Sequence, residues 1–267
     1  MFDYSTYTCD DRPTAIVVCV DYADFLRLTL PMNVKHFSRV FVMTTPDDFK
    51  TVSVAVQWGA IVVPTRVFYD DGAAFNKGAA IEEAFELSGR SGWYVVLDAD
   101  IVLPPDVNLF GDWRSVGNLY TPKRRMMESP DFGNILDWRK CQGIPVRESE
   151  EFAGYFQMFH SSDPSIQVRP WYPTNWRHAG GCDTEFWKRW PKVNRVRPPF
   201  EVLHLGADGV NWCGRVTPDI STGFVSSLAS IRHRKMQQIL RRREEPRGDG
   251  VPRFYGERIG EDVGEEE

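Results

Sequence analysis

Short apolar segments alternate with longer amphipathic segments over the first hundred residues of the chain. Runs of β-branched and aromatic residues at 15–20, 40–43, 61–63 and 93–97 predict four strands, of which the first and the fourth are expected to be buried. Between them, residues 22–36, 47–58 and 75–87 carry apolar side chains at helical spacing. Strands that alternate with helices predict βαβ units, and hence an α/β fold with a mostly parallel central sheet flanked by helices.

The pattern changes after about residue 105. Residues 122–150 are charged and predict an irregular segment, whereas 152–160 and 202–205 predict further strands and 224–243 a basic helix. We expect one domain over residues 1–245. Its parts are a first half (14–105), a variable second half (106–223) and a C-terminal helix (224–245), followed by a flexible acidic tail (246–267).

Composition narrows the class of protein. The 267 residues are 42% hydrophobic with a net charge of −5, which excludes a disordered chain and gives no general attraction to nucleic acid. No apolar run approaches the length of a membrane helix, so we expect no membrane segment. The five cysteines are scattered without a C-x-x-C pair, and the N-terminal residues show no secretory pattern. We therefore expect a cytoplasmic protein.

Ligands of parallel α/β sheets bind at the carboxyl ends of the strands, and the sharpest polar feature lies there. Asp98-Ala99-Asp100 closes the predicted strand over 93–97. Two carboxylates so close together suit a hard divalent cation that also holds substrate phosphates. An exposed turn is the alternative, because aspartate is common after strands.

Three further positions could complete an anion and metal site. Asn76-Lys77-Gly78 opens a predicted helix, where free N–H groups and a lysine can bind phosphate and the glycine admits a ligand. An ordinary helix start capped by Asn76 is the alternative. His204 can ligate a metal or lie in the core, and Arg215 can clamp phosphate or form an ion pair.

An acidic helix start follows a glycine pair in Gly180-Gly181-Cys182-Asp183-Thr184-Glu185. Asp183 can be a helix cap or a general base that activates an acceptor hydroxyl. The Trp and Tyr residues concentrated over 169–190 can form platforms for sugar rings or fill the core.

The order and spacing of these motifs resemble those of nucleotide-sugar-dependent glycosyltransferases of the GT-A fold. The resemblance rests on Asp98-Ala99-Asp100, on His204 about a hundred residues later, and on Phe75-Asn76-Lys77-Gly78 before them. It is greatest to small bacterial and bacteriophage-encoded members, with a galactosyltransferase-like second half at Gly180-Gly181-Cys182-Asp183. It covers roughly residues 14–215 and departs at Cys182, where the family often has glutamate.

The resemblance implies a Rossmann-like GT-A domain and a role for each matching position. Asp98, Asp100 and His204 would bind a metal, Mn²⁺ or Mg²⁺. Asp183, with Glu185 nearby, would be the catalytic base of an inverting transfer. The nucleotide-sugar would be held by these residues: Val20, Asp21, Tyr22, Thr44, Thr45, Asp48, Asn76, Lys77, Asp98, Ala99 and Arg215.

The donor implied by the resemblance is a nucleotide-sugar, most commonly a UDP-hexose. The acceptor would be a hydroxyl group on a protein, a modified DNA base or a soluble glycan, in the host cytoplasm if the protein is phage-encoded. For DNA, clusters such as Lys123-Arg124-Arg125 could contact phosphates, or they could be solvated surface charge. A non-catalytic module that binds carbohydrate or nucleotide is the alternative of another class. A nucleotidyltransferase fits less well, because the segment after the first strand, 21–25, is acidic.

Overall fold

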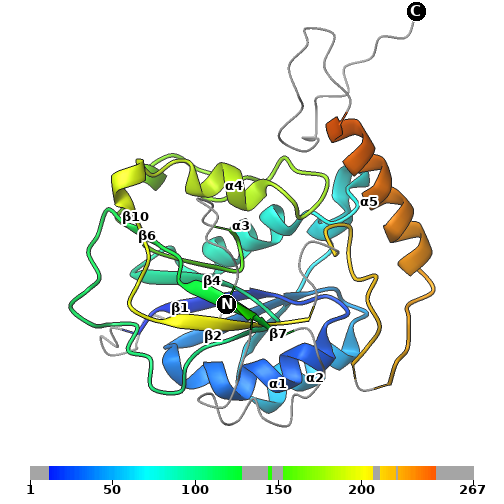
Figure 1. Cartoon of the computed structure of the whole chain (residues 1–267), viewed down its shortest axis with the longest axis horizontal. Helices are drawn as coiled ribbons and strands as arrows, with labels where there is room; N and C mark the ends of the chain where they lie inside the picture. Colours follow the sequence, from blue (N-terminus) through cyan, green and yellow to red (C-terminus); the bar gives the residue numbers. More distant parts are fainter. Residues whose placement is uncertain (1–11, 128–143, 146–152, 207–210, 221, 245–267) are drawn as a thin grey trace, which may run out of the picture.

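The central sheet has seven strands in the order β10-β6-β9-β4-β1-β2-β3 (Figure 1). The structure, a computed structural model, describes residues 12–127, 144–145, 153–206, 211–220 and 222–244. The parallel half of the sheet contains β1 (Thr14–Val18), β2 (Arg39–Thr44), β3 (Ile61–Pro64) and β4 (Trp93–Asp98). Beyond β4 lie β9 (Phe156–His160), antiparallel to both its neighbours, then β6 (Leu119–Tyr120) and β10 (Arg195–Val196).

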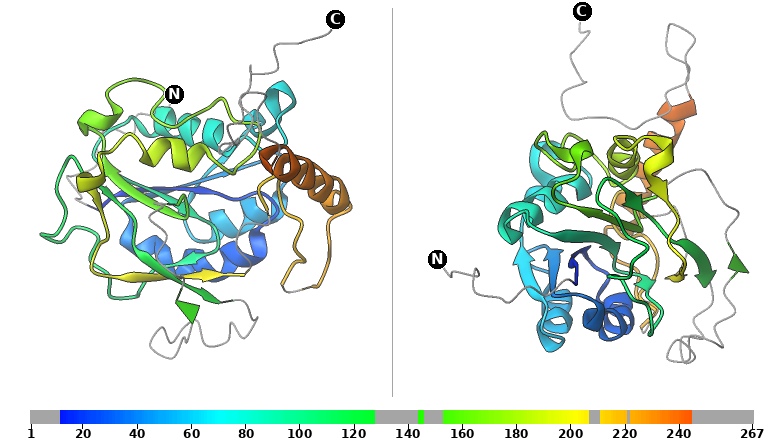
Figure 2. Two further views of the ribbon diagram at one scale, coloured as in Figure 1. Left: turned by 45° about the horizontal axis from the view of Figure 1, so that its top comes forward. Right: turned by 90° about the vertical axis from the view of Figure 1, so that its left-hand side faces the viewer.

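Helices cover both faces of this sheet (Figure 2). On one face α1 (Ala23–Asn33) and α2 (Phe49–Gln57) pack together, and on the other α3 (Lys77–Ser88) contacts α4 (Cys182–Trp187). The last helix, α5 (Ala229–Glu244), lies at the side of the molecule (Figure 1). The predicted α/β fold, a mostly parallel sheet flanked by helices, is confirmed.

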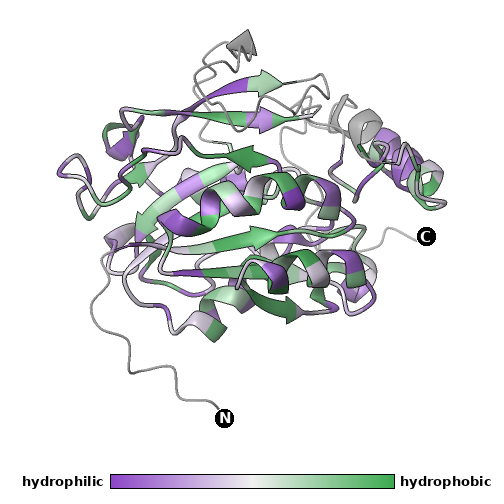
Figure 3. Ribbon diagram, turned by 90° about the horizontal axis from the view of Figure 1, so that it is seen from below, coloured by the Kyte–Doolittle hydropathy of each residue, from purple (hydrophilic) through white to green (hydrophobic). Residues whose placement is uncertain are grey.

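The apolar runs form strands because both faces of the sheet are covered. Side chains alternate along β1, so Ala15 and Val17 pack in the core beneath α1 and α2, while Ile16 and Val18 face α3. All four are buried, and the strands are correspondingly hydrophobic in Figure 3. An uninterrupted apolar run is what such a doubly covered strand requires.

A second sheet contains β5 (Ile101–Val102), β11 (Glu201–Leu205), β7 (Lys123–Met127) and β8 (Ile144–Pro145), in that order. The prediction of an irregular segment over 122–150 is therefore wrong for residues 123–127. Despite their charged sequence these residues form β7, because β11 pairs with β7 in parallel along the whole length of both strands. Residues 128–143 and 146–150 lie outside the described residues.

The C-terminal helix starts later than its pattern predicts, at Ala229 instead of residue 224. Ser226 explains the difference, because its hydroxyl accepts a hydrogen bond from the Leu228 N–H at 3.2 Å and forms a turn before the helix. The predicted tail over 246–267 lies outside the described residues. Within the described part of the chain, no helix is both long and apolar enough to cross a membrane.

Candidate functional site

The turn that carries Asp98 and Asp100 links the two sheets. Asp98 ends β4, and Val18 of β1 lies opposite it, so the ends of both strands meet at one edge. Two side chains of α1 hold the turn. The Thr29 hydroxyl donates to the Ala99 carbonyl at 2.7 Å. The Asn33 side-chain amide donates to the Ile101 carbonyl at 2.7 Å and accepts from the Leu103 N–H at 2.9 Å. These buried bonds limit the positions that both carboxylates can take.

His204 reaches Asp100 because β11 pairs with β5 directly after the turn, with His204 opposite Ile101. His204 Nε2 lies 3.5 Å from Asp100 Oδ2. The other ring nitrogen, Nδ1, lies 2.8 Å from Nη1 of Arg124, a residue of β7. Burial lowers the pKa of His204 and Arg124 lowers it further, but the charge and hydrogen bond of Asp100, together with the charge of Asp98, outweigh both, so the net shift is upward.

Lys77 forms an ion pair with Asp98 from the first turn of α3. Asn76 begins this helix: its Oδ1 accepts from the Ala79 N–H at 3.0 Å, and its Nδ2 donates to the Thr174 carbonyl at 2.7 Å. Burial alone would lower the pKa of Lys77, but the nearby negative charge, chiefly that of Asp98, raises it. Burial raises the pKa of Asp98, against the effect of Lys77.

The prediction that Gly78 leaves room for a ligand is wrong, because protein backbone fills the space next to it. A Cβ atom at this position would lie 1.9 Å from the carbonyl oxygen of Pro173. The glycine therefore lets α3 pack directly on the backbone of residues 173–174, and this packing positions Lys77 next to it.

Several of the residues predicted to hold the nucleotide-sugar, namely those near the ends of the first two strands, converge on Asp48, the N-cap of α2. Its Oδ1 accepts from the Thr51 N–H at 3.1 Å, and its Oδ2 accepts from the Asp21 N–H at 2.8 Å and the Thr44 hydroxyl at 3.2 Å. Asp21 has a φ of 62° at the end of the first βα connection. Val20 and Thr45 are buried beside this cluster.

Tyr22 follows Asp21 of this cluster and senses the charges of the carboxylate turn. Burial raises the pKa of Tyr22, and the charge of Asp100 raises it further. The phenol therefore lies within the electrostatic reach of the predicted metal ligands.

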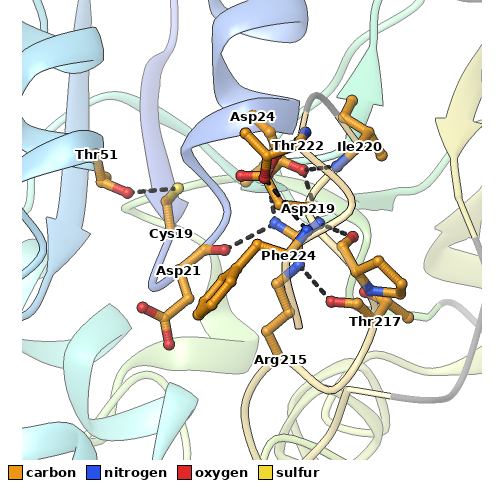
Figure 4. Close-up of polar contacts among 12 residues, drawn as sticks. Cys19, Asp21, Asp24, Thr51, Arg215, Thr217, Asp219, Ile220, Thr222 and Phe224 are labelled. Carbon is orange, nitrogen blue, oxygen red and sulfur yellow. Dashed lines mark hydrogen bonds and ion pairs between the residues drawn. The ribbon is translucent and has the colours of Figure 1, made fainter. Parts of the chain in front are cut away.

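Arg215 has a different role from the predicted phosphate clamp (Figure 4). Its guanidinium forms a two-point ion pair with Asp24 of α1, with Nη2 at 2.7 Å from Oδ2. It also donates to the carbonyls of Asp21, Thr217 and Pro218 at 2.8, 3.1 and 2.5 Å. All five N–H groups of the side chain are thus used within the protein, and the arginine joins the segment around 215–220 to α1.

Asp183 lies in the first turn of α4. Its Oδ2 accepts from the Gly154 N–H at 2.7 Å and its Oδ1 from the Gly181 N–H at 3.3 Å. Glu185, the second predicted carboxylate, accepts from the Trp176 indole at 3.1 Å. Asp183 also contributes to the raised pKa of Lys77, so its charge reaches the Lys77–Asp98 pair.

The aromatic residues over 169–190 fill the core and form no sugar platform. They pack in one core cluster with Phe159 and with residues of α3 and α4. The buried members are Trp171, Tyr172, Trp176, Trp187 and Trp190.

Asp100 and His204 fit a divalent cation that takes two ligands from the protein. Asp100 Oδ1 is buried and has no hydrogen-bond partner in the structure, which leaves a carboxylate oxygen available to a cation. The third predicted ligand, Asp98, is occupied by Lys77. Among the described residues, no group of three or more His, Cys, Asp or Glu side chains could hold a metal ion.

Two arginines at the site were not predicted to lie there. Arg124 contacts His204, although the sequence offered only a cluster of cations. Arg232 of α5 is buried, forms an ion pair with Asp21 at 2.8 Å and donates to the Arg215 carbonyl at 3.0 Å. Both contacts depend on which strands and helices meet in space, and no local pattern in the sequence signals either.

Comparisons with known proteins find structural similarity only. No protein-family model matches the chain, and no curated protein does. Among solved structures, a mannosyltransferase from Pyrobaculum calidifontis, in complex with GDP-Man and Mn²⁺, is 16% identical with a TM-score of 0.45. The match covers 72% of this chain and 56% of the mannosyltransferase.

Two synthases are similar to the chain at a comparable level. Glucosyl-3-phosphoglycerate synthase from Mycobacterium tuberculosis is 15% identical over 84% of this chain and 80% of its own, with a TM-score of 0.43. Mannosyl-3-phosphoglycerate synthase from Rubrobacter xylanophilus is 13% identical over 94% and 88%, with a TM-score of 0.45. Because these values are low, we argue the function from the residues of this chain.

Proposed function

We propose that the protein is a metal-dependent glycosyltransferase that moves a hexose from a nucleotide-sugar, a UDP-sugar, to a hydroxyl acceptor. One observation carries the proposal: at the carboxyl edge of the sheet His204 lies 3.5 Å from Asp100, and Asp98 pairs with Lys77 beside them. Paired carboxylates, an imidazole and a lysine at this edge are the groups that bind a divalent cation together with a diphosphate.

Each group has a role in this proposal. The Asp48 cluster with Asp21 and Tyr22 holds the nucleoside, and Lys77 contacts the diphosphate next to Asp98. Asp100 and His204 would hold Mn²⁺ or Mg²⁺, which, when bound, neutralises the charge that develops on the departing diphosphate.

Asp183 is the proposed base of an inverting transfer. Its carboxylate takes the proton of the acceptor hydroxyl while the new bond to the sugar forms on one face. The bond from the sugar to the diphosphate breaks on the other, and its electron pair stays on the phosphate oxygen. The N–H groups of Gly154 and Gly181 support this role, because their hydrogen bonds hold both carboxylate oxygens in position.

Donor binding is tested first, by thermal unfolding of the protein with UDP, GDP, CDP and their sugars, with and without Mn²⁺. A ligand at 100 times its Kd stabilises by about 2.7 kcal/mol, which gives a clear shift. A metal-dependent shift with one nucleotide supports the proposal, and no shift with any of them contradicts it.

Catalysis is tested by Asp183→Asn, with release of nucleoside diphosphate from the donor as an assay that needs no known acceptor. We expect turnover to fall by roughly 10²- to 10⁴-fold while the nucleotide-dependent thermal shift remains. Glu185→Gln is the matched control, because it removes one charge two residues away. Full activity in Asp183→Asn would refute the role of this residue, and a protein that binds donors without turnover would be a binding module.

A further inference from the structure

Arg124 occupies the nitrogen of His204 that faces away from Asp100. The guanidinium Nη1 lies 2.8 Å from His204 Nδ1. Arginine has donors and no acceptor, so the imidazole must present a lone pair at Nδ1. A neutral ring then carries its proton on Nε2, the nitrogen that faces Asp100 Oδ2 at 3.5 Å.

This arrangement conflicts with metal binding at Nε2. A histidine that ligates through Nε2 normally keeps its proton on Nδ1 and donates it to a carbonyl, a carboxylate or water. Here the Nδ1 proton would point at an arginine N–H. The hydrogen bond from Arg124 and a metal ion on His204 therefore exclude each other.

The surroundings hold Arg124 in this position. Its guanidinium lies over the Tyr155 ring, 4.6 Å from the ring centroid. The Tyr155 hydroxyl donates to the carbonyl of Pro122 at 2.5 Å, which fixes the ring against the start of β7. Arg124 also lies on a strand paired with β11, the strand of His204.

We propose that Arg124 is a positioning residue that competes with the metal for His204, so that the ion binds only when it displaces the Arg124 hydrogen bond. The inference rests on the proposed function, because it assumes that Asp100 and His204 are metal ligands. Asp100 Oδ1, which is buried without a hydrogen-bond partner, would be the second protein ligand, and it is available to a cation even while Arg124 is hydrogen-bonded to the imidazole.

The test is the affinity of the full chain for Mn²⁺ alone, followed by the electron paramagnetic resonance signal of the free ion. Arg124→Met removes the competing donor, and we expect it to bind Mn²⁺ about tenfold more tightly than the unchanged protein. Arg124→Gln is a second variant, whose amide oxygen can accept the Nδ1 proton; it should bind at least as tightly. If Arg124→Met fails to fold, the Mn²⁺ affinity of Arg124→Gln tests the proposal instead.

Arg125→Met is the matched control for charge. Arg125 follows on β7 and points to the opposite side, where it pairs with Glu201 at 2.6 Å. Its loss should change the Mn²⁺ affinity by less than about twofold, because the charge is partly exposed and screened.

The outcomes separate this inference from the proposed function. If the unchanged protein binds Mn²⁺ and the Arg124 variants bind it equally or more weakly, Arg124 does not compete, and the inference is overturned while the proposed function stands. If neither the unchanged protein nor the variants bind Mn²⁺, both fail. An increase confined to the Arg124 variants supports the inference.

Discussion

The Arg215–Asp24 pair offers the most quantitative test of the site as the structure shows it. Arg215→Met leaves the Asp24 carboxylate buried, with the Ile220 N–H, 2.8 Å from Asp24 Oδ2, as a remaining donor. Removing one partner of a buried ion pair costs about 3–5 kcal/mol, because the other charge stays uncompensated. Three carbonyl groups lose a donor as well, so we expect the upper part of this range.

The free energy of unfolding is measured by urea titration with tryptophan fluorescence. A loss of about 4 kcal/mol should also lower Tm by roughly 8–16 °C in a chain of this size. The double variant Asp24→Leu, Arg215→Met should recover part of the loss, because it leaves no buried charge. A loss below about 1 kcal/mol, with donor binding abolished, would refute the reasoning and restore Arg215 as a phosphate clamp.

Two further predictions concern stability. Gly78→Ala should destabilise the protein by about 2–3 kcal/mol, because its methyl group would meet the Pro173 carbonyl at 1.9 Å; an unchanged urea midpoint would contradict this packing. Burial, with Lys35 nearby, lowers the pKa of His36 to about 4. The folded protein thus keeps His36 neutral, and up to about 3 kcal/mol of stability, present above pH 6.5, is lost as the pH falls toward 4. His36→Gln should flatten this fall between pH 7 and 4.5; an equally steep fall would exclude His36 as its cause.

Local sequence patterns determined most of the secondary structure in the first half of the chain. The apolar runs that became β1, β2 and β4 are almost entirely buried, so burial and strand propensity favour the same structure there, whereas the edge strand β3 is only partly buried. Asn76 and Asp48 cap α3 and α2, and the side chain of each accepts a hydrogen bond from the backbone N–H three residues later. Such interactions lie within a few residues, which makes them readable from a sequence.

Contacts between distant segments were decided by the tertiary structure. The cationic run at 123–127 forms a strand because β11 supplies its backbone partner some eighty residues later. Arg215 was expected at a phosphate, but the buried Asp24 carboxylate on α1 and three backbone carbonyls accept all five of its side-chain N–H groups. From the sequence, Arg124 was expected to be a cation on the surface, whereas in the structure its side chain contacts His204.

The difference has a physical reason. A sequence shows which side chains could bind a metal, a phosphate or a proton, and it identified Asp98, Asp100, His204, Lys77 and Asp183 on that basis. Whether each group is available depends on the charges that face it in space, and these come from elements far away along the chain. The sequence therefore determined the types of chemistry at the strand ends, and the tertiary structure decided which of these groups are already paired.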